Sequence, residues 1–293
     1  MAMQPAAGSF VQRAIDLTFK IGSGPYGDGP QTIVSLTGLR VQVSIQNAGQ
    51  PGSSFAHIRV FGVSPSLINQ ISTLGNHHYT RYNAVQIAAG TPGKMPVVFD
   101  GNIIDAYADF GAPPQMALTI NAQAIGIIRV KPVAPSSFSG TASVAVIMAS
   151  LAGQAGLALE NNGVSVQLSN PYFPGTLWEQ IVSCANAANI NAFVDSAAGV
   201  LAIWPRTGSR QGDAITISPA TGMIGYPTYQ RNGPIVRTLF NPLVRTGGTM
   251  RVESSIVPPT ATWQIMVVTH DIESQVPDGA WETMMVGAIL GAL

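Results

Sequence analysis

Alternation of apolar and polar residues dominates the first part of the chain. Alternate residues are apolar across residues 11–21, apart from Arg13, and again across residues 39–46. A period of two is typical of a strand that buries one face. Further strands are predicted from the same signal, at residues 57–63, 85–89, 96–104 and 117–122. The pattern therefore predicts a sheet over this part of the chain.

Turn residues separate these strands. Residues 22–30 and 47–53 are rich in Gly, Pro, Ser and Asn, and both are predicted to be loops. The first is no phosphate-binding loop, because it lacks the Lys and Ser/Thr of that motif and no helical pattern follows it. Ser64 followed by Pro65 predicts a capped helix that starts there and ends near Ile71.

The periodicity changes after about Pro135. Apolar residues at helical spacing predict a helix over residues 141–159, and Thr176 with Glu179 forms the signature of a capping box that opens a second helix. Strands are predicted around these helices, at residues 164–168, 190–194 and 200–204. Residues 135–212 are therefore expected to form a small α/β domain.

Strand patterns return after Gly212. They are predicted at residues 215–218, 234–240, 249–254, 262–272 and 280–286. The expected fold class is mainly β, with a small α/β domain between two strand-rich segments. The predicted divisions are residues 1–134, 135–212 and 213–293, and the last segment either packs against the first or completes it.

Charge is scarce in this sequence. Only 10% of the residues are charged and the formal net charge is +0, whereas roughly 25% are charged in an average soluble domain. Such a chain has no electrostatic footprint for specific nucleic-acid binding or for an anionic membrane. Residues 142–159 are uncharged but rich in Ala, Gly and Ser, so we expect a buried helix and no stable membrane insertion. Residues 1–10 show no signal-peptide pattern.

Three acidic residues are the candidates for hydrolytic chemistry. Asp100, Asp105 and Asp109 could supply the paired carboxylates of a glycoside hydrolase. Sequence does not show their separation in space, and acidic residues near a strand end are ordinary solvated positions. We therefore predict that these carboxylates are not catalytic.

Histidine and cysteine give weaker signals. His77 and His78 are adjacent and lack a third ligand at metal-binding spacing. His270 and Glu273 could share a metal only on a helix, and in the predicted strand they face opposite sides. Cys184 lies in a predicted helix and is expected to be a buried, inert thiol. No catalytic, cofactor-binding or metal-binding residue is predicted, and no cofactor.

The C-terminal part carries a recognisable combination of motifs. It includes the run at 222–229, Leu-Phe-Asn-Pro at 239–242, Gly-Gly at 247–248, the strand at 263–268 with His-Asp at 270–271, the turn at 277–279 and Trp-Glu-Thr at 281–283. In this order they resemble the baseplate hub proteins of contractile-tailed phages, a VgrG-like family with tail-tube-like barrels. The resemblance covers residues 167–286, while the first 130 or so residues match only in strand pattern.

The resemblance implies tail-tube-like β-barrel domains with a small α/β domain between them. It implies a homotrimer that joins the tail tube protein to the central spike protein, contacts other baseplate subunits and encloses a channel for DNA. The protein would then reside in the virion, after assembly in the host cytoplasm. No peptidoglycan-degrading domain is evident, so we expect no enzymatic activity.

Two other functions remain open at this point. The chain could be another virion tail, adaptor or carbohydrate-binding subunit. A glycan hydrolase that uses the acidic residues between Asp100 and Asp109 is the more distant alternative.

Overall fold

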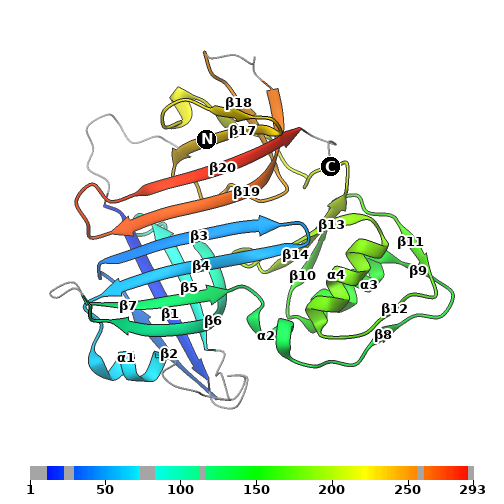
Figure 1. Cartoon of the computed structure of the whole chain (residues 1–293), viewed down its shortest axis with the longest axis horizontal. Coiled ribbons are helices and arrows are strands. Elements are labelled where there is room, and N and C mark those ends of the chain that lie inside the picture. The colour runs from blue at the N-terminus through cyan, green and yellow to red at the C-terminus, as the bar shows by residue number, and fades with distance from the viewer. Residues whose placement is uncertain (1–11, 23–29, 73–82, 112–115, 256–260, 290–293) are drawn as a thin grey trace.

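One large sheet organises the molecule. The computed structural model describes residues 12–22, 30–72, 83–111, 116–255 and 261–289. The sheet runs in the order β16-β17-β20-β19-β3-β4-β7-β6-β5-β1-β2, and each neighbouring pair along this path is antiparallel. Strands from both ends of the sequence therefore lie side by side in its centre (Figure 1). The predicted mainly β class is confirmed.

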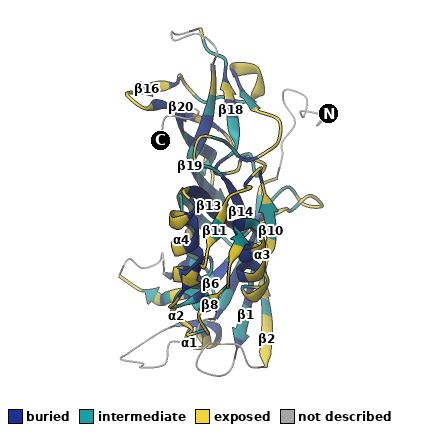
Figure 2. Ribbon diagram, turned by 90° about the vertical axis from the view of Figure 1, so that its right-hand side faces the viewer, coloured by how far each residue is buried: buried dark blue, intermediate teal, exposed yellow. Residues whose placement is uncertain are grey.

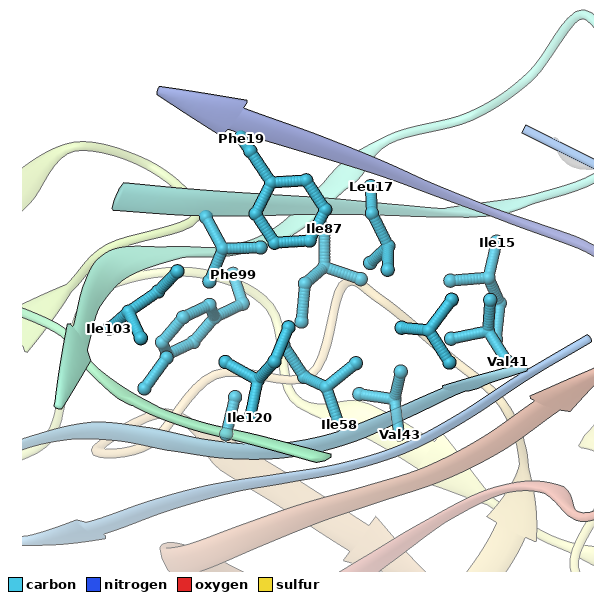
Figure 3. Close-up of a cluster of buried hydrophobic side chains, with 14 of the residues drawn as sticks. Ile15, Leu17, Phe19, Val41, Val43, Ile58, Ile87, Phe99, Ile103 and Ile120 are labelled. Atoms are coloured by element: carbon cyan, nitrogen blue, oxygen red, sulfur yellow. The ribbon is translucent and has the colours of Figure 1, made fainter. Parts of the chain in front are cut away.

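The N-terminal strands curl around a first core. They are β1 (Ala14–Gly22), β2 (Gln31–Leu36), β3 (Val41–Gly49), β4 (Gly52–Phe61), β5 (Ala84–Gly90), β6 (Val97–Asp109) and β7 (Ala117–Gln123), with the helix α1 (Pro65–Ile71). The predicted alternation places Ile15, Leu17 and Phe19 of β1 inside, fully or almost fully buried. Figure 3 shows these side chains directed towards Val41 and Ile58. Each such buried side chain stabilises the fold by about 1.5–3 kcal/mol.

Two local predictions in this region have different outcomes. The Ser64 side chain accepts a hydrogen bond from the Leu67 backbone N–H at 3.3 Å, which confirms the predicted helix cap. The loop predicted at residues 47–53 is wrong in extent, because β3 and β4 continue through it to a two-residue turn. Glycine makes the tight turn possible, since a Cβ at Gly52 would lie 2.2 Å from the Gly49 carbonyl oxygen.

The middle of the chain forms an α/β unit with its own core. Its helices are α2 (Gly126–Val130), α3 (Val144–Gln154) and α4 (Leu177–Ala187). Its strands are β8 (Ser136–Ser137), β9 (Thr141–Ser143), β10 (Ala158–Asn161), β11 (Gln167–Ser169), β12 (Tyr172–Phe173), β13 (Ile190–Asp195) and β14 (Val200–Pro205). Both halves of the capping box form, with Thr176 N–H donating to Glu179 at 2.7 Å and Glu179 N–H to Thr176 at 3.3 Å. The predicted hairpin is also present as β13 and β14.

The helix predicted at residues 141–159 is wrong at both ends. Its first residues pair with β11 as the strand β9, and its last residues form β10, which runs parallel to β14. Gly156 has a φ of +73°, a left-handed conformation that commonly follows the end of a helix. The strand predicted at residues 164–168 begins later than expected, because the observed strand β11 starts at Gln167.

The C-terminal elements build a third core. They are β15 (Ile215–Ile217), the 3-10 turn η1 (Pro219–Thr221), β16 (Thr228–Gln230), β17 (Gly233–Leu239), β18 (Thr249–Val252), β19 (Ala261–Ser274) and β20 (Trp281–Ile289). The long strand β19 pairs with β18 at its start and with β3 at its end. A register shift between Ile265 and Val267 separates these two parts. Ile265 and Val268, on either side of the shift, lie in the third core, and Ile272 further along the strand lies in the first.

Among the described residues, no helix has the length and apolar character needed to cross a membrane. The short elements β2, β8, β9, β12, β16 and α2 were not predicted. The strands β8, β9, β12 and β16 are two or three residues long, so each is too short to show a periodic pattern.

Candidate assembly junction

The three cores meet where the α/β unit joins the large sheet. β13 pairs in parallel with β4, with Phe193 opposite Gly52 and Val194 opposite Ser53. Phe193, Ala202 and Trp204 form a small buried cluster of their own. The sheet of the α/β unit is therefore hydrogen-bonded to the sheet of the first core.

Arg210 is the centre of this junction. It lies in the loop that follows β14, and its side chain is only 2% exposed. Its Nε donates to Glu160 Oε1 at 2.8 Å and its Nη2 to Glu160 Oε2 at 2.7 Å. Its Nη1 donates to Asp195 Oδ2 at 3.0 Å. The guanidinium thus binds one carboxylate through both oxygens and holds a second one at the side.

The charges of these groups are mutually dependent. The hydrogen bond from Arg210 lowers the pKa of Glu160, against the burial that would raise it. Burial opposes the charge of Arg210, but the hydrogen bonds that it donates to Glu160 and the charge of Asp195 outweigh burial and raise the pKa of the guanidinium. Glu160 and Arg210 therefore both stay ionised, and their charges are paired inside the protein.

Backbone contacts tie Arg210 to the other two cores. Its N–H donates to the Gly247 carbonyl at 2.7 Å, and its Nη1 reaches the Thr246 carbonyl at 3.4 Å. The Thr246 hydroxyl donates to the carbonyl of Asn47, at the end of β3, at 3.2 Å. Gly247 packs against the Trp204 indole, so that a Cβ there would lie 2.5 Å from the ring. We call Glu160, Asp195, Arg210, Thr246 and Gly247 the junction.

The junction is suited to holding parts in place. Its carboxylates are engaged with Arg210, and its Thr246 hydroxyl donates to the Asn47 carbonyl. A cleft of about 210 Å³ lies beside it, lined in part by Phe193, Leu243 and Arg245. The arrangement fixes the orientation of the α/β unit relative to the two strand-rich cores.

The acidic candidates are not brought together. Asp100, Asp105 and Asp109 all lie within β6, and each has a different partner. Asp100 binds Lys20 at 3.3 Å and Gln86 at 2.9 Å. Asp105 accepts from Asn121 at 3.0 Å, and Asp109 lies 3.5 Å from Arg59. The contacts of these carboxylates are structural, and they do not resemble a catalytic pair.

His270 is a buried residue between strands. Its Nδ1 lies 2.9 Å from the Thr283 hydroxyl, and the Phe240 ring contacts it edge-on. Burial lowers the pKa of His270 to about 4, so the ring is neutral at physiological pH. Glu273 lies on the other face of β19 and accepts from Gln42 at 3.2 Å. The prediction that the two residues face opposite sides is confirmed.

The other two candidates have simple outcomes. Cys184 is buried in α4 as predicted, and burial raises the pKa of its thiol to about 12. His77 and His78 lie outside the described residues. In the part of the chain that the structure describes, no group of three or more His, Cys, Asp and Glu side chains could hold a metal ion.

Sequence reasoning missed the junction. Glu160, Asp195 and Arg210 are far apart in sequence and belong to no motif. One signal in the sequence pointed to Glu160, which is an isolated charge in a long uncharged stretch. A charged side chain that is buried needs a partner of opposite charge.

The fold is shared with solved phage tail proteins. The 43 kDa tail protein of prophage MuSo2 from Shewanella oneidensis superposes with a TM-score of 0.59 at 10% identity, over 94% of this chain and 96% of that one. A tail protein from Neisseria meningitidis MC58 gives 0.60 at 10% identity, over 95% and 96%. A chain of the half-lidded Francisella PdpA-VgrG complex gives 0.55 at 7% identity, over 96% of this chain and 59% of that one. No curated protein sequence matches.

These likenesses define the class of fold as that of phage tail proteins. The family model described as baseplate hub gp41 matches residues 14–280. The chain belongs to this baseplate hub family, and it is a structural subunit of a phage tail baseplate. The resemblance seen at residues 167–286 is confirmed, and the match extends to the N-terminal strands.

Proposed function

We propose that this chain is the hub subunit that joins the tail tube to the central spike, and that three copies form a ring around a channel. The sheet supports this proposal, because it runs without a break through the first and third cores by way of β19. One chain then presents two strand-rich units, and three chains present six. Such a ring matches a six-fold tube on one side and a three-fold spike on the other.

The proposal divides the chain at the predicted boundaries, into residues 1–134, 135–212 and 213–293. Residues 213–293 would form a second strand-rich unit and would also complete the first one. Ile272, Phe240 and Trp281 pack into the first core, which supports completion of the first unit by the last segment. The α/β unit then stands between two tube-like units, and the junction fixes its orientation.

The proposed partners are a second and third copy of the chain, the tail tube protein, the spike protein and other baseplate subunits. The fold match to a chain from a PdpA-VgrG complex supports an assembling role. We infer that the chain has no enzymatic activity, since each acidic candidate is engaged in a different structural contact. DNA would pass through the ring without specific binding, because the chain has no net positive charge.

Sedimentation of the purified chain, alone and with its spike protein, tests the proposal. We expect a species of three times the 30.6 kDa of one chain, and a larger complex when spike is added. A chain that stays a monomer with and without spike would contradict it.

A further inference from the structure

The outer face of the large sheet carries a row of polar side chains. The strands of this sheet alternate between buried and less buried residues, so one face holds the first core and the other lies outside it (Figure 2). Strands β4, β3 and β19 lie side by side (Figure 1), with His57 opposite Ser44 and Ser44 opposite Asp271. Residues directly opposite each other in an antiparallel pair have Cβ atoms about 4.5–5.5 Å apart on one face. The three side chains therefore form one short row.

A cleft follows this row. It has a volume of about 180 Å³, and the polar residues that line it are Ser44, His57 and Asp271 together with Gln42, Arg59 and Glu273. The Gln42 amide donates to Glu273 at 3.2 Å and accepts from Arg59 at 3.5 Å. Part of the lining is therefore held in place by hydrogen bonds within the chain.

Hydrogen bonds also fix the imidazole of His57. The Asn121 amide nitrogen donates to Asp105 at 3.0 Å, and the Asn121 amide oxygen lies 2.8 Å from His57 Nδ1. An amide oxygen only accepts hydrogen bonds, so Nδ1 carries the hydrogen. In the neutral ring, Nε2 is then the bare nitrogen and acts as a hydrogen-bond acceptor.

The row itself is left without partners inside the protein. In the part of the chain that the structure describes, the Ser44 hydroxyl, the Asp271 carboxylate and His57 Nε2 form no hydrogen bond or ion pair. Asp271 also lies opposite Glu282, whose own carboxylate is bound to Arg237. The row therefore offers an acceptor on either side of a hydroxyl that both donates and accepts.

This arrangement favours a ligand with several adjacent hydroxyl groups. Such hydroxyls can donate to Asp271 and to His57 Nε2, and one of them can accept from Ser44. A cationic ligand would be repelled by the Arg59 guanidinium, which lines the same cleft, and an anionic ligand by the free carboxylate of Asp271. A neutral sugar supplies the hydroxyls without either repulsion.

An exposed aromatic side chain lies further along the same face. Tyr107 of β6 is 45% exposed and lies opposite Thr119, which in turn lies opposite Arg59. Neighbouring strands are about 4.8 Å apart, so Tyr107 lies roughly 10 Å from Arg59 across the sheet. Its flat ring can pack against the C–H face of a second or third sugar of one chain.

We propose that the cleft lined by Ser44, His57 and Asp271 binds a neutral saccharide, whose hydroxyls contact this row and whose next units extend over Tyr107. The inference goes beyond the proposed function and does not depend on ring formation. It gives the chain a glycan-binding site in addition to its structural contacts.

Saturation-transfer NMR with the full chain tests the proposal. The probes are glucose, galactose, mannose and N-acetylglucosamine, and at least one of them should bind the wild-type chain with a dissociation constant in the millimolar range. D271N keeps the size of the side chain but removes a charged acceptor, so it should weaken binding at least about tenfold. D213N is the matched control, because Asp213 is an exposed acid outside the cleft, and it should bind as the wild type does.

Two further variants locate the sugar on the face. S44A removes only the hydroxyl, so it should weaken binding several-fold and unfold thermally as the wild type does. Tyr107→Leu should weaken binding of the trisaccharide of the preferred sugar several-fold and leave binding of the single sugar unchanged. A purely structural role of Tyr107 would change both affinities or neither.

Three outcomes would overturn the proposal. The first is that none of the four sugars binds the wild-type chain. The second is that D271N and S44A bind as well as D213N does, which would place the sugar elsewhere. The third is that the chain binds Zn²⁺ through Asp271 and binds no sugar. A monomeric chain that binds sugar would instead support this inference and contradict the proposed function.

Discussion

Replacement of Arg210 by Met should destabilise the protein more than any replacement of a surface arginine. The guanidinium is 2% exposed and makes three short hydrogen bonds, at 2.7, 2.8 and 3.0 Å, to Glu160 and Asp195. The variant R210M would leave both carboxylates without it, and Arg245, at 3.9 Å from Glu160, is a weak substitute. Removal of one partner from a buried ion pair costs about 3–5 kcal/mol.

We expect a loss near the lower end of that range, about 3 kcal/mol. Glu160 and Asp195 keep 27% and 14% of their side-chain surface exposed, so water can solvate them in part. Domains are stable by only about 5–15 kcal/mol, so a loss of this size is a large fraction of the total.

Urea unfolding followed by tryptophan fluorescence measures this loss. Trp204 packs against Gly247 in the junction and should report on it directly. R251M is the matched control, because Arg251 forms an exposed pair with Glu253 that should contribute at most about 0.5 kcal/mol. Addition of E160Q and D195N to R210M should restore part of the stability, since neutral amides need no cation. If R210M costs no more than R251M, the junction does not hold the units together.

Three further predictions concern single residues. Gly247→Ala should destabilise the protein by at least about 2 kcal/mol in thermal unfolding, because the φ of Gly247 is +84° and the new Cβ would meet Trp204. Gly140→Ala is the control, with a φ of +77° and open space around the Cβ, and it should cost only about 1 kcal/mol. Equal losses in the two variants would contradict the packing of Gly247 against Trp204. His270 has a pKa of about 4 when folded and about 6.5 when unfolded, so the unfolded chain binds the proton more tightly and the free energy of unfolding should fall between pH 6.5 and 4. This fall should be absent in H270Q, and an unchanged pH profile would refute the assignment. Cys184 should resist alkylation by iodoacetamide at pH 8 in the native protein and react after unfolding, because only the thiolate attacks; rapid native labelling would contradict its burial.

Local patterns predicted the local elements well. The alternation at residues 39–46 became β3, with Val41, Val43 and Ile45 buried, and the Thr176 capping box opens α4. In these segments the residues that determine the structure are neighbours in sequence. A periodic pattern or a cap is therefore sufficient to predict them.

Long-range pairing was not predictable in the same way. Residues 158–159 were predicted as the end of the preceding helix, yet they begin β10 because β14 offers a parallel partner about 40 residues away. The register shift in β19 was not predicted, and neither was the contribution of this one strand to two cores. The junction depends on three charged residues that only the fold brings together.

Electron microscopy of the purified chain, alone and mixed with its spike protein, shows whether the chain forms the proposed hub ring. We expect three-fold rings with a central hole, capped when spike is present. Six-fold rings would instead indicate a tube or adaptor subunit, and single molecules in both samples would contradict the hub function.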